Sequence, residues 1–182
     1  MILLYTFSAL EQYQARRKRA LEFLDLAVYS VSLRAVQCDN DTDYSDAIKS
    51  LWRSDDLLLM EQDIVPTLQQ LSFAERLFKE HYLFAFPYYL YPASTRLELP
   101  VLSHRVVDDS RRGWRWGTLD DEYADFVGFG FSGISLAIQD SFPASWFDGK
   151  TWQTMDTEFS YEMQDRGLKW YIPRSIVEHD HI

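Results

Sequence analysis

The sequence predicts an α/β fold in which helices flank a mostly parallel central sheet, organised as a single domain over residues 1–182. Two observations support this class. Apolar, strand-like runs alternate with segments of helical spacing through the first third of the chain, an order typical of parallel sheets. Acidic clusters follow two of these runs directly, and open α/β sheets bind ligands at the carboxyl ends of their strands.

The first third of the chain is expected to start with a strand, a helix and a second strand. Residues 1–7 are apolar and aromatic, as in a buried strand. Ser8 and Glu11 have the spacing of a capping box, which would start a helix ending near residue 26. The valine-rich segment 28–37 predicts the second strand.

A buried strand with an acidic exit is predicted at the centre of the sheet. A helix over 44–53 leads to four apolar residues, 57–60, which Glu61, Gln62 and Asp63 follow. Because side chains alternate along a strand, Glu61 and Asp63 would lie on one side, about 7 Å apart. Two such carboxylates can bind a hard divalent cation through oxygen, and an acidic turn of structural role is the other interpretation.

The middle of the chain predicts one helix, aromatic strands and a long connection. Ser72 and Glu75 match a capping box and would start the helix. The aromatic segment 82–91 and the short segment 97–102 are expected to be strands. Residues 103–125 are charged and weakly patterned, with arginines and tryptophans close together, so we predict a mobile loop.

The C-terminal third predicts a helix and a strand before two histidines. Asp156 opens the helix, which ends at Gly167, a residue type favoured just beyond a helix. A strand over 168–173 follows, and His179 and His181 stand near the end of the sequence.

The composition restricts the classes of function. The chain has 18 Lys and Arg against 28 Asp and Glu, a net charge of −10, which disfavours nucleic acid as a partner because such binders neutralise phosphates. The single cysteine, Cys38, excludes an internal disulfide and a multi-cysteine zinc site. The sequence contains neither a long apolar run nor the features of a signal peptide, so we expect a cytoplasmic protein without stable membrane insertion.

Taken in order, these features resemble the small glycosyltransferases of the GT-A (Rossmann-like) fold, close in plan to the family-2 type. The matching parts are a strand with an acidic exit, an apolar strand ending at the D-x-D position, a glycine-containing segment, an acidic helix start, and a Y-x-P strand followed by a histidine: 36–43, 57–63, 128–135, 155–158 and 171–179. Three features depart from the family pattern. Glu61 replaces the first aspartate of D-x-D, the segment between the second and third acidic elements is short, and no Q-x-x-R-W element follows Asp156.

The resemblance implies a metal-dependent, hexosyltransferase-like enzyme that moves a sugar from a nucleotide-sugar donor, most simply a UDP-sugar, to an acceptor hydroxyl with inversion. Asp156 would be the catalytic base. The metal, Mn²⁺ or Mg²⁺, would be held by Asp63 with Glu61 and by His179 or His181. The donor would contact a set of residues at the strand ends: Thr6, Asp39, Glu61, Gln62 and Asp63.

Other interpretations of the same residues stay open. Asp156 could be a helix N-cap, Asp39 an ordinary turn residue, and the two histidines a solvated tail. The domain could bind a nucleotide or a carbohydrate without catalysis, or serve as an interaction module. A third alternative is a glycosyltransferase whose acceptor is a modified DNA base.

Overall fold

The computed structural model describes residues 1–10, 14–90, 101–108 and 113–179. Four residues that carried sequence predictions lie outside these ranges: Glu11, Arg111, Arg112 and His181, as does most of the predicted strand 97–102. Within the described ranges, no helix has both the length and the apolar character needed to cross a membrane.

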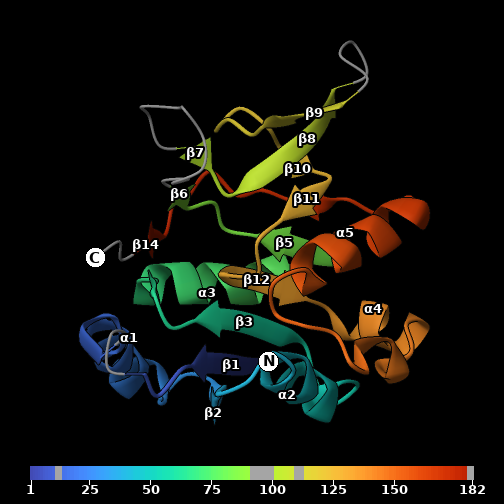
Figure 1. Ribbon diagram of the computed structural model, residues 1–182. Coiled ribbons are helices and arrows are strands. Elements are labelled where there is room, and N and C mark those ends of the chain that lie inside the picture. Colours follow the sequence, from blue (N-terminus) through green and yellow to red (C-terminus); the bar gives the residue numbers. More distant parts are fainter. Residues whose placement is uncertain (11–13, 91–100, 109–112, 180–182) are drawn as a thin grey trace.

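A seven-stranded sheet forms the centre of the described structure (Figure 1). Its spatial order is β10 (Tyr123–Ala124), β13 (Trp170–Tyr171), β5 (Leu83–Ala85), β12 (Phe131–Ile134), β3 (Leu57–Glu61), β1 (Ile2–Phe7) and β2 (Ser32–Gln37). β1 is parallel to both β2 and β3, and β5 is parallel to β13. Only β12 and β10 are antiparallel to their neighbours in this sheet. The predicted α/β fold with a mostly parallel sheet is therefore confirmed.

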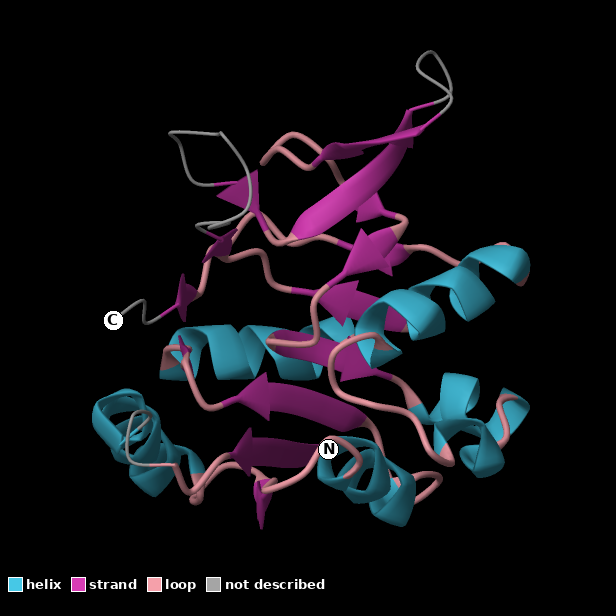
Figure 2. Ribbon diagram, viewed as in Figure 1, coloured by secondary structure: helices cyan, strands magenta, loops and turns pink. Residues whose placement is uncertain are grey.

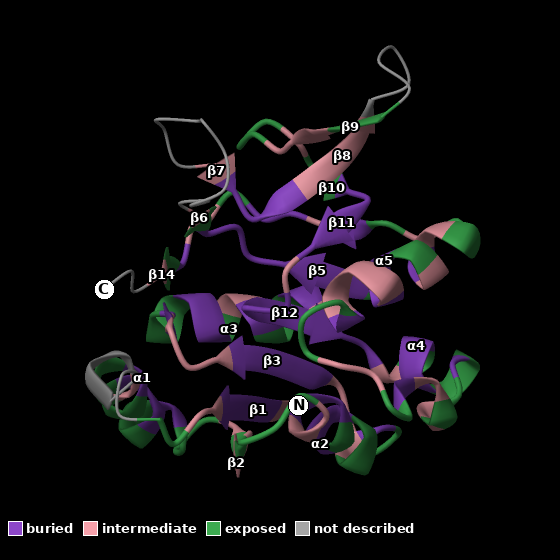
Figure 3. Cartoon of the chain, in the orientation of Figure 1, coloured by how far each residue is buried: buried purple, intermediate pink, exposed green. Residues whose placement is uncertain are grey.

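Helices cover both faces of the sheet, as the alternation of helix and strand predicts (Figure 2). One face is covered by α1 (Gln14–Ala27) and α3 (Leu68–Leu77). The other is covered by α2 (Asp43–Leu51), α4 (Leu136–Ser141), the 3-10 helix η2 (Ala144–Phe147) and α5 (Met155–Asp165). Leu58 packs on the first face and Leu57 and Leu59 on the second, because side chains alternate along β3. The strand is buried on both sides (Figure 3), which explains its uninterrupted apolar run.

Small sheets flank the central one and replace the loop predicted over residues 103–125. β8 (His104–Asp108) pairs with β9 (Gly113–Trp116) and with β11 (Phe126–Val127). The prediction of a mobile loop is wrong for the described part of this stretch. Across the β8–β9 hairpin, Arg105 stands opposite Trp116 and Val107 opposite Trp114. Valine and tryptophan favour strands, and the interleaved charges hid their alternation in the sequence.

Two further pairs of short strands are formed by segments far apart in the sequence. β6 (Tyr89–Leu90) pairs with β7 (Val101–Leu102), and β4 (Ile64–Val65) pairs with β14 (Glu178–His179). The second pair places His179 opposite Ile64, the residue that directly follows Asp63. This pairing brings the predicted C-terminal histidine to the acidic exit of β3.

The structure moves one predicted helix start by five residues. Thr67 is the N-cap of α3: its hydroxyl accepts a hydrogen bond from the Gln70 amide at 3.2 Å, and the Gln70 side chain accepts one from the Thr67 amide at 2.9 Å. Ser72, which the sequence pattern placed at the cap, lies inside the helix. The helix extends back almost to Pro66 because this earlier capping box is complete.

Two alanine substitutions distinguish the caps. Thr67→Ala should lower the free energy of unfolding by about 1 kcal/mol, because an amide of the first turn loses its acceptor. Ser72→Ala lies on the exposed side of α3 and should change it by less than about 0.5 kcal/mol. Urea denaturation followed by circular dichroism measures both. A loss at Ser72 equal to that at Thr67 would contradict the observed cap.

Candidate functional site

A pocket of about 370 Å³ opens where the carboxyl ends of β1, β2 and β3 meet. All five residues predicted to bind the donor line it: Thr6, Asp39, Glu61, Gln62 and Asp63. The pocket forms at this edge because the chain passes from β1 to β2 on one side of the first strand and then to β3 on the other. That change of direction is where open α/β sheets bind ligands.

Hydrogen bonds hold the loops that follow the strands. The Ser8 amide donates to Gln62 Oε1 at 2.8 Å, which ties the exit of β1 to the exit of β3. The amides of Asp39 and Asn40 donate to Asp43 Oδ2 at 2.7 and 3.0 Å. These two bonds hold the pKa of Asp43 below its ordinary value and fix the turn between β2 and α2. Asp39 is thereby held at the rim of the pocket by backbone contacts.

Asp63 of the pocket and His179 lie within hydrogen-bonding distance of each other. Nε2 of His179 lies 3.2 Å from Oδ2 of Asp63, and Nδ1 lies 3.0 Å from the carbonyl oxygen of Tyr89. Because a carbonyl only accepts, Nδ1 must carry a proton and donate it. A neutral ring then presents its Nε2 lone pair to a carboxylate oxygen. The contact is favourable when a proton on Nε2, or a metal ion, lies between the two atoms.

The geometry of this pair fits two ligands of one metal ion. Ligands at right angles on an ion of Mg²⁺ size, with bonds of about 2.1 Å, stand about 3 Å apart. A metal-bound histidine usually donates its other ring N–H to a carbonyl or carboxylate, as His179 does to Tyr89. Across the residues that the structure describes, no three His, Cys, Asp or Glu side chains converge to hold an ion by themselves. Asp63 and His179 would therefore share it with oxygens of a ligand or of water.

Glu61 lies beside this pair and is only partly exposed. Burial raises the pKa of Glu61 to about 8, and the negative charges of Asp63 and Asp156 contribute to the same shift. Without a bound cation, this carboxyl group therefore holds its proton at neutral pH. A cation in the pocket would favour the ionised form, which is the form able to act as a ligand.

Asp156 lies next to the pocket rather than among its lining residues, and its charge acts on Glu61. The helix N-cap is Thr154 and α5 begins at Met155, so the alternative of an N-cap role for Asp156 is wrong. Its Oδ1 accepts a hydrogen bond from the Thr157 amide at 2.6 Å. Burial raises the pKa of Asp156 above its ordinary value despite this bond. The shift moves the carboxylate towards the range of a general base.

Tyr88 was not predicted, although two glycines in the sequence accommodate it. A Cβ at Gly128 would lie 2.3 Å from the Tyr88 hydroxyl, and one at Gly130 would lie 2.7 Å from its ring. The ring packs edge-on against His179 with centroids 5.0 Å apart. Burial and then the charge of Glu61 raise the pKa of Tyr88 well above its ordinary value, so its hydroxyl stays protonated. The glycine-rich segment therefore makes room for a hydroxyl beside the carboxylates.

Tyr44 and Trp152 were also missed. Tyr44 is 5% exposed and lines the pocket from α2, and its buried hydroxyl has no hydrogen-bond partner in good geometry within the described structure. It lies close enough to Glu61 to lower the pKa of that carboxyl group slightly. Trp152 also lines the pocket, with 56% of its surface exposed, and its amide donates to the Asp41 carbonyl at 3.0 Å. The exposed ring of Trp152 is available to a ligand, whereas the buried Tyr44 hydroxyl lies against Glu61.

The raised pKa of Glu61 predicts a pH-dependent stability in metal-free buffer. The folded state holds the proton up to about pH 8, whereas the unfolded chain releases it near pH 4.5, so stability should fall as the pH rises through this window. Glu61→Gln cannot ionise, and we expect it to melt about 2–8 °C above the parent at about pH 9 but at nearly the same temperature at about pH 4.

Differential scanning fluorimetry across this pH range measures the effect. Glu75→Gln, on the exposed side of α3, removes one negative charge away from the pocket and serves as the control. Parallel pH curves for Glu61→Gln and the parent would show that Glu61 ionises normally.

Comparison with known proteins shows the fold. No protein-family model and no curated protein matches this sequence. A197 from STIV superposes with a TM-score of 0.67 at 17% identity, over 100% of this chain and 87% of A197. A putative glucose-1-phosphate thymidylyltransferase from Bacillus anthracis, crystallised with a sucrose, superposes with a TM-score of 0.50 at 8% identity, over 95% and 86% of the two chains.

A third structure lies at the margin of similarity. S. aureus TarS 1–349 superposes with a TM-score of 0.49 at 10% identity, over 99% of this chain and 60% of TarS. TarS 1–349 has also been solved in complex with UDP-GlcNAc. The superpositions on A197 and on the thymidylyltransferase, both far below 25% identity, establish a GT-A-like, nucleotidyltransferase-like α/β fold, and membership of family 2 stays a prediction.

Proposed function

We propose that this protein is a metal-dependent glycosyltransferase that moves a sugar from a UDP-sugar to an acceptor hydroxyl, with inversion. The observation that carries the proposal is the Asp63–His179 pair at the edge of a pocket between the central strand ends, because its spacing suits two ligands of one metal ion as well as an ion pair. The volume of that pocket, about 370 Å³, falls in the range of small-ligand sites.

The charge of the pocket supports a metal-bound diphosphate. Four carboxylates line it, those of Asp39, Asp41, Glu61 and Asp63, and none of its lining residues is Lys or Arg. A diphosphate would be repelled there unless a divalent cation accompanied it. Asp63 and His179, with Glu61 beside them, would hold that ion, which when bound stabilises negative charge on the leaving diphosphate. The electrostatics of the pocket and the resemblance both support the proposed metal dependence.

The turn after β2 supports a nucleobase site. Asp39 presents acceptor oxygens at the rim and is fixed by the backbone contacts to Asp43. Trp152 exposes its ring at the same rim, where it can stack on a base. The base would therefore lie between a hydrogen-bond acceptor suited to an imide N–H and an aromatic surface.

Asp156 is the proposed base for the acceptor. A free hydroxyl is a weak nucleophile, and a carboxylate that takes its proton during attack on the anomeric carbon assists the transfer. Attack from the side opposite the leaving diphosphate inverts the configuration at that carbon. The protonated Tyr88 hydroxyl, near both Glu61 and Asp156, can donate to a sugar oxygen between the donor and acceptor sides.

Nucleotide binding should depend on both the metal and Asp63. Calorimetric titration with UDP should give measurable binding in the presence of Mn²⁺ and little after chelation with EDTA. We expect Asp63→Asn and His179→Ala each to weaken UDP–Mn²⁺ binding about 10- to 100-fold, because each removes one ligand of the ion. Asp25→Asn, exposed on α1, is the charge-matched control and should bind as the parent does. Equal affinity with and without the metal would refute the proposed cation site.

Turnover should depend on Asp156 while donor binding does not. Release of UDP from UDP-glucose, UDP-galactose and UDP-GlcNAc, with water as the acceptor, gives an assay that needs no identified acceptor. Asp156→Asn should reduce this rate about 10²- to 10⁴-fold and leave the Kd for UDP–Mn²⁺ within about twofold. Unchanged turnover would show that another group is the base. Binding without turnover of any donor by the parent would favour the non-catalytic module.

A further inference from the structure

Arg105 joins a group of aromatic side chains near Asp156. Its guanidinium carbon lies 4.9 Å from the ring centroid of Trp114, 5.8 Å from that of Trp116 and 5.4 Å from that of Phe126. Phe126 in turn packs edge-on against Tyr161 of α5, with centroids 4.7 Å apart. Trp114 is 49% exposed and Tyr161 is 54% exposed. We call these five residues the Arg105 cluster.

The cluster lies within one side-chain length of the proposed base. Nη2 of Arg105 donates to the Thr157 hydroxyl at 3.4 Å, and Thr157 directly follows Asp156. The positive charge of Arg105 also acts on the Asp156 carboxylate. Figure 1 shows β8, β9 and β11 gathered at the end of the molecule next to α5. An acceptor whose hydroxyl donates a hydrogen bond to the Asp156 carboxylate would therefore lie next to this cluster.

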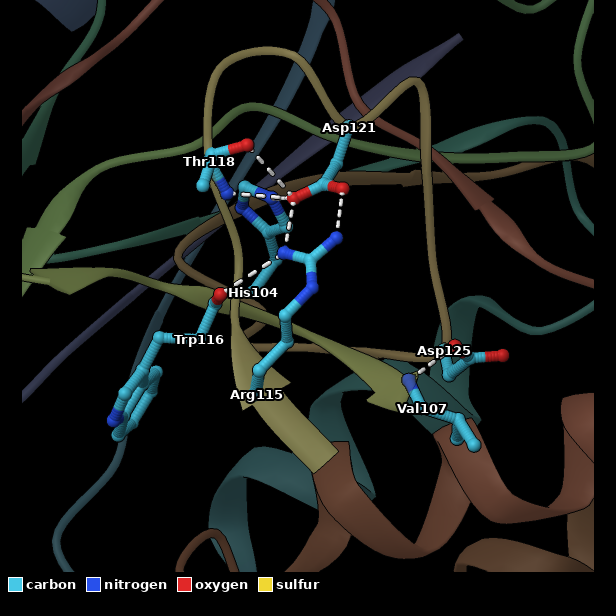
Figure 4. A network of polar contacts seen from close by, with 7 residues as sticks. All are labelled: His104, Val107, Arg115, Trp116, Thr118, Asp121 and Asp125. Atoms are coloured by element: carbon cyan, nitrogen blue, oxygen red, sulfur yellow. Dashed lines mark hydrogen bonds and ion pairs between the residues drawn. The ribbon is translucent and has the colours of Figure 1, made fainter. Parts of the chain in front are cut away.

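A network of polar contacts holds the hairpin that carries the two tryptophans (Figure 4). Arg115 donates two hydrogen bonds to the Asp121 carboxylate, one of them at 2.8 Å, and a third to the carbonyl oxygen of Trp116 at 3.2 Å. Asp121 also accepts from the Thr118 amide at 2.7 Å. These contacts hold the pKa of Asp121 at about 2, so the network stays ionised and intact at neutral pH.

The turn that follows β9 packs closely against the His104 side chain. A Cβ at Gly117 would lie 1.9 Å from Nε2 of the buried His104, so this turn follows the imidazole closely. On the other side of β8, the Val107 amide donates to Asp125 Oδ2 at 2.8 Å. The rings of the Arg105 cluster are therefore held in place before a ligand binds, which lowers the entropic cost of binding.

We infer that the Arg105 cluster binds a sugar ring of the acceptor through the exposed rings of Trp114 and Tyr161, so that the acceptor is a carbohydrate. This inference rests on the proposed function. Pyranose rings present C–H groups on one face, which pack on aromatic surfaces, and hydroxyls at the edge, which hydrogen-bond to polar groups such as those around Asp156. The guanidinium of Arg105 is engaged by three rings and lies near a carboxylate, which makes it a poor phosphate ligand.

The size of the surface argues against a protein acceptor that docks by this face. A stable protein interface buries about 800 Å² on each partner. Two half-exposed rings supply only a fraction of that area, but they match one or two sugar units. These two exposed rings therefore suit a glycan chain better than a protein surface.

Binding of oligosaccharides tests the inference directly. The probes are cellohexaose, chitohexaose, maltohexaose and xylohexaose, measured by saturation-transfer NMR and calorimetry on the full chain. At least one should bind the parent. Trp114→Ala should weaken that binding at least about tenfold, whereas Trp114→Phe, which keeps an aromatic ring, should stay within about threefold. Tyr29 is 89% exposed and lies far in the sequence from the Arg105 cluster. Tyr29→Ala is therefore the matched control and should bind as the parent does.

The same samples, titrated with UDP and Mn²⁺, separate this inference from the proposed function. UDP–Mn²⁺ binding by the parent without binding of any of the four oligosaccharides would overturn the carbohydrate site alone. Oligosaccharide binding that Trp114→Ala leaves unchanged would also overturn it. If the parent protein does not bind UDP–Mn²⁺ at all, the proposed function is refuted instead. If Trp114→Ala does not fold, Tyr161→Ala applies the same test from α5, with the same expected loss.

Discussion

The parallel pairing of β1 with β2 and β3 is the constraint on which the rest of the structure depends. It brings three strand exits to one edge, so residues separated by more than fifty positions line one pocket. The helices follow from it, because each parallel connection must cross a face of the sheet. The pocket follows as well, since the chain leaves β1 in opposite directions on its two sides. The pocket is thus a product of topology, and side chains only complete it.

The parts that could be predicted are those in which local pattern and burial coincide. Strand β3 could be predicted because it is buried on both faces and therefore has four consecutive apolar residues, 57–60. The carboxylates after it could be predicted as its exit because they end this apolar run. Tyr44 and Tyr88 could not be found in this way. In the sequence they are ordinary core aromatics, and only the packing across the sheet places their hydroxyls beside Glu61. The β8–β9 hairpin was missed because arginines alternate there with aromatic residues, whose contacts with Arg105 are tertiary.

A buried carboxylate beside two further carboxylates is costly for a fold that could have avoided it. Burial and then the charges of Asp63 and Asp156 raise the pKa of Glu61, so this group holds a proton and part of the repulsion is removed. Local arrangements that oppose stability are typical of functional sites. The sequence resemblance anticipated the grouping of Asp63 with His179, and the structure places Glu61 beside that pair. The carboxylate chemistry therefore supports a site selected for binding a cation.

The pairing of β4 with β14 has a kinetic consequence. Asp63 and His179 are 116 residues apart in the sequence. The segment that carries His179 is held by the two-residue pairing of β14 with β4, by an exposed ion pair between Arg19 and Glu178, and by hydrogen bonds from Gln70. Exposed ion pairs stabilise little, so we expect local opening of this segment at a cost set mainly by the buried Val177, whose amide donates to the Pro87 carbonyl oxygen at 3.0 Å. Closing so long a loop also favours late formation of the contact in folding. Hydrogen exchange at β14 would then be faster than in β1 or β3, and the occupancy of the proposed cation site would report a local equilibrium that is separable from the stability of the whole chain.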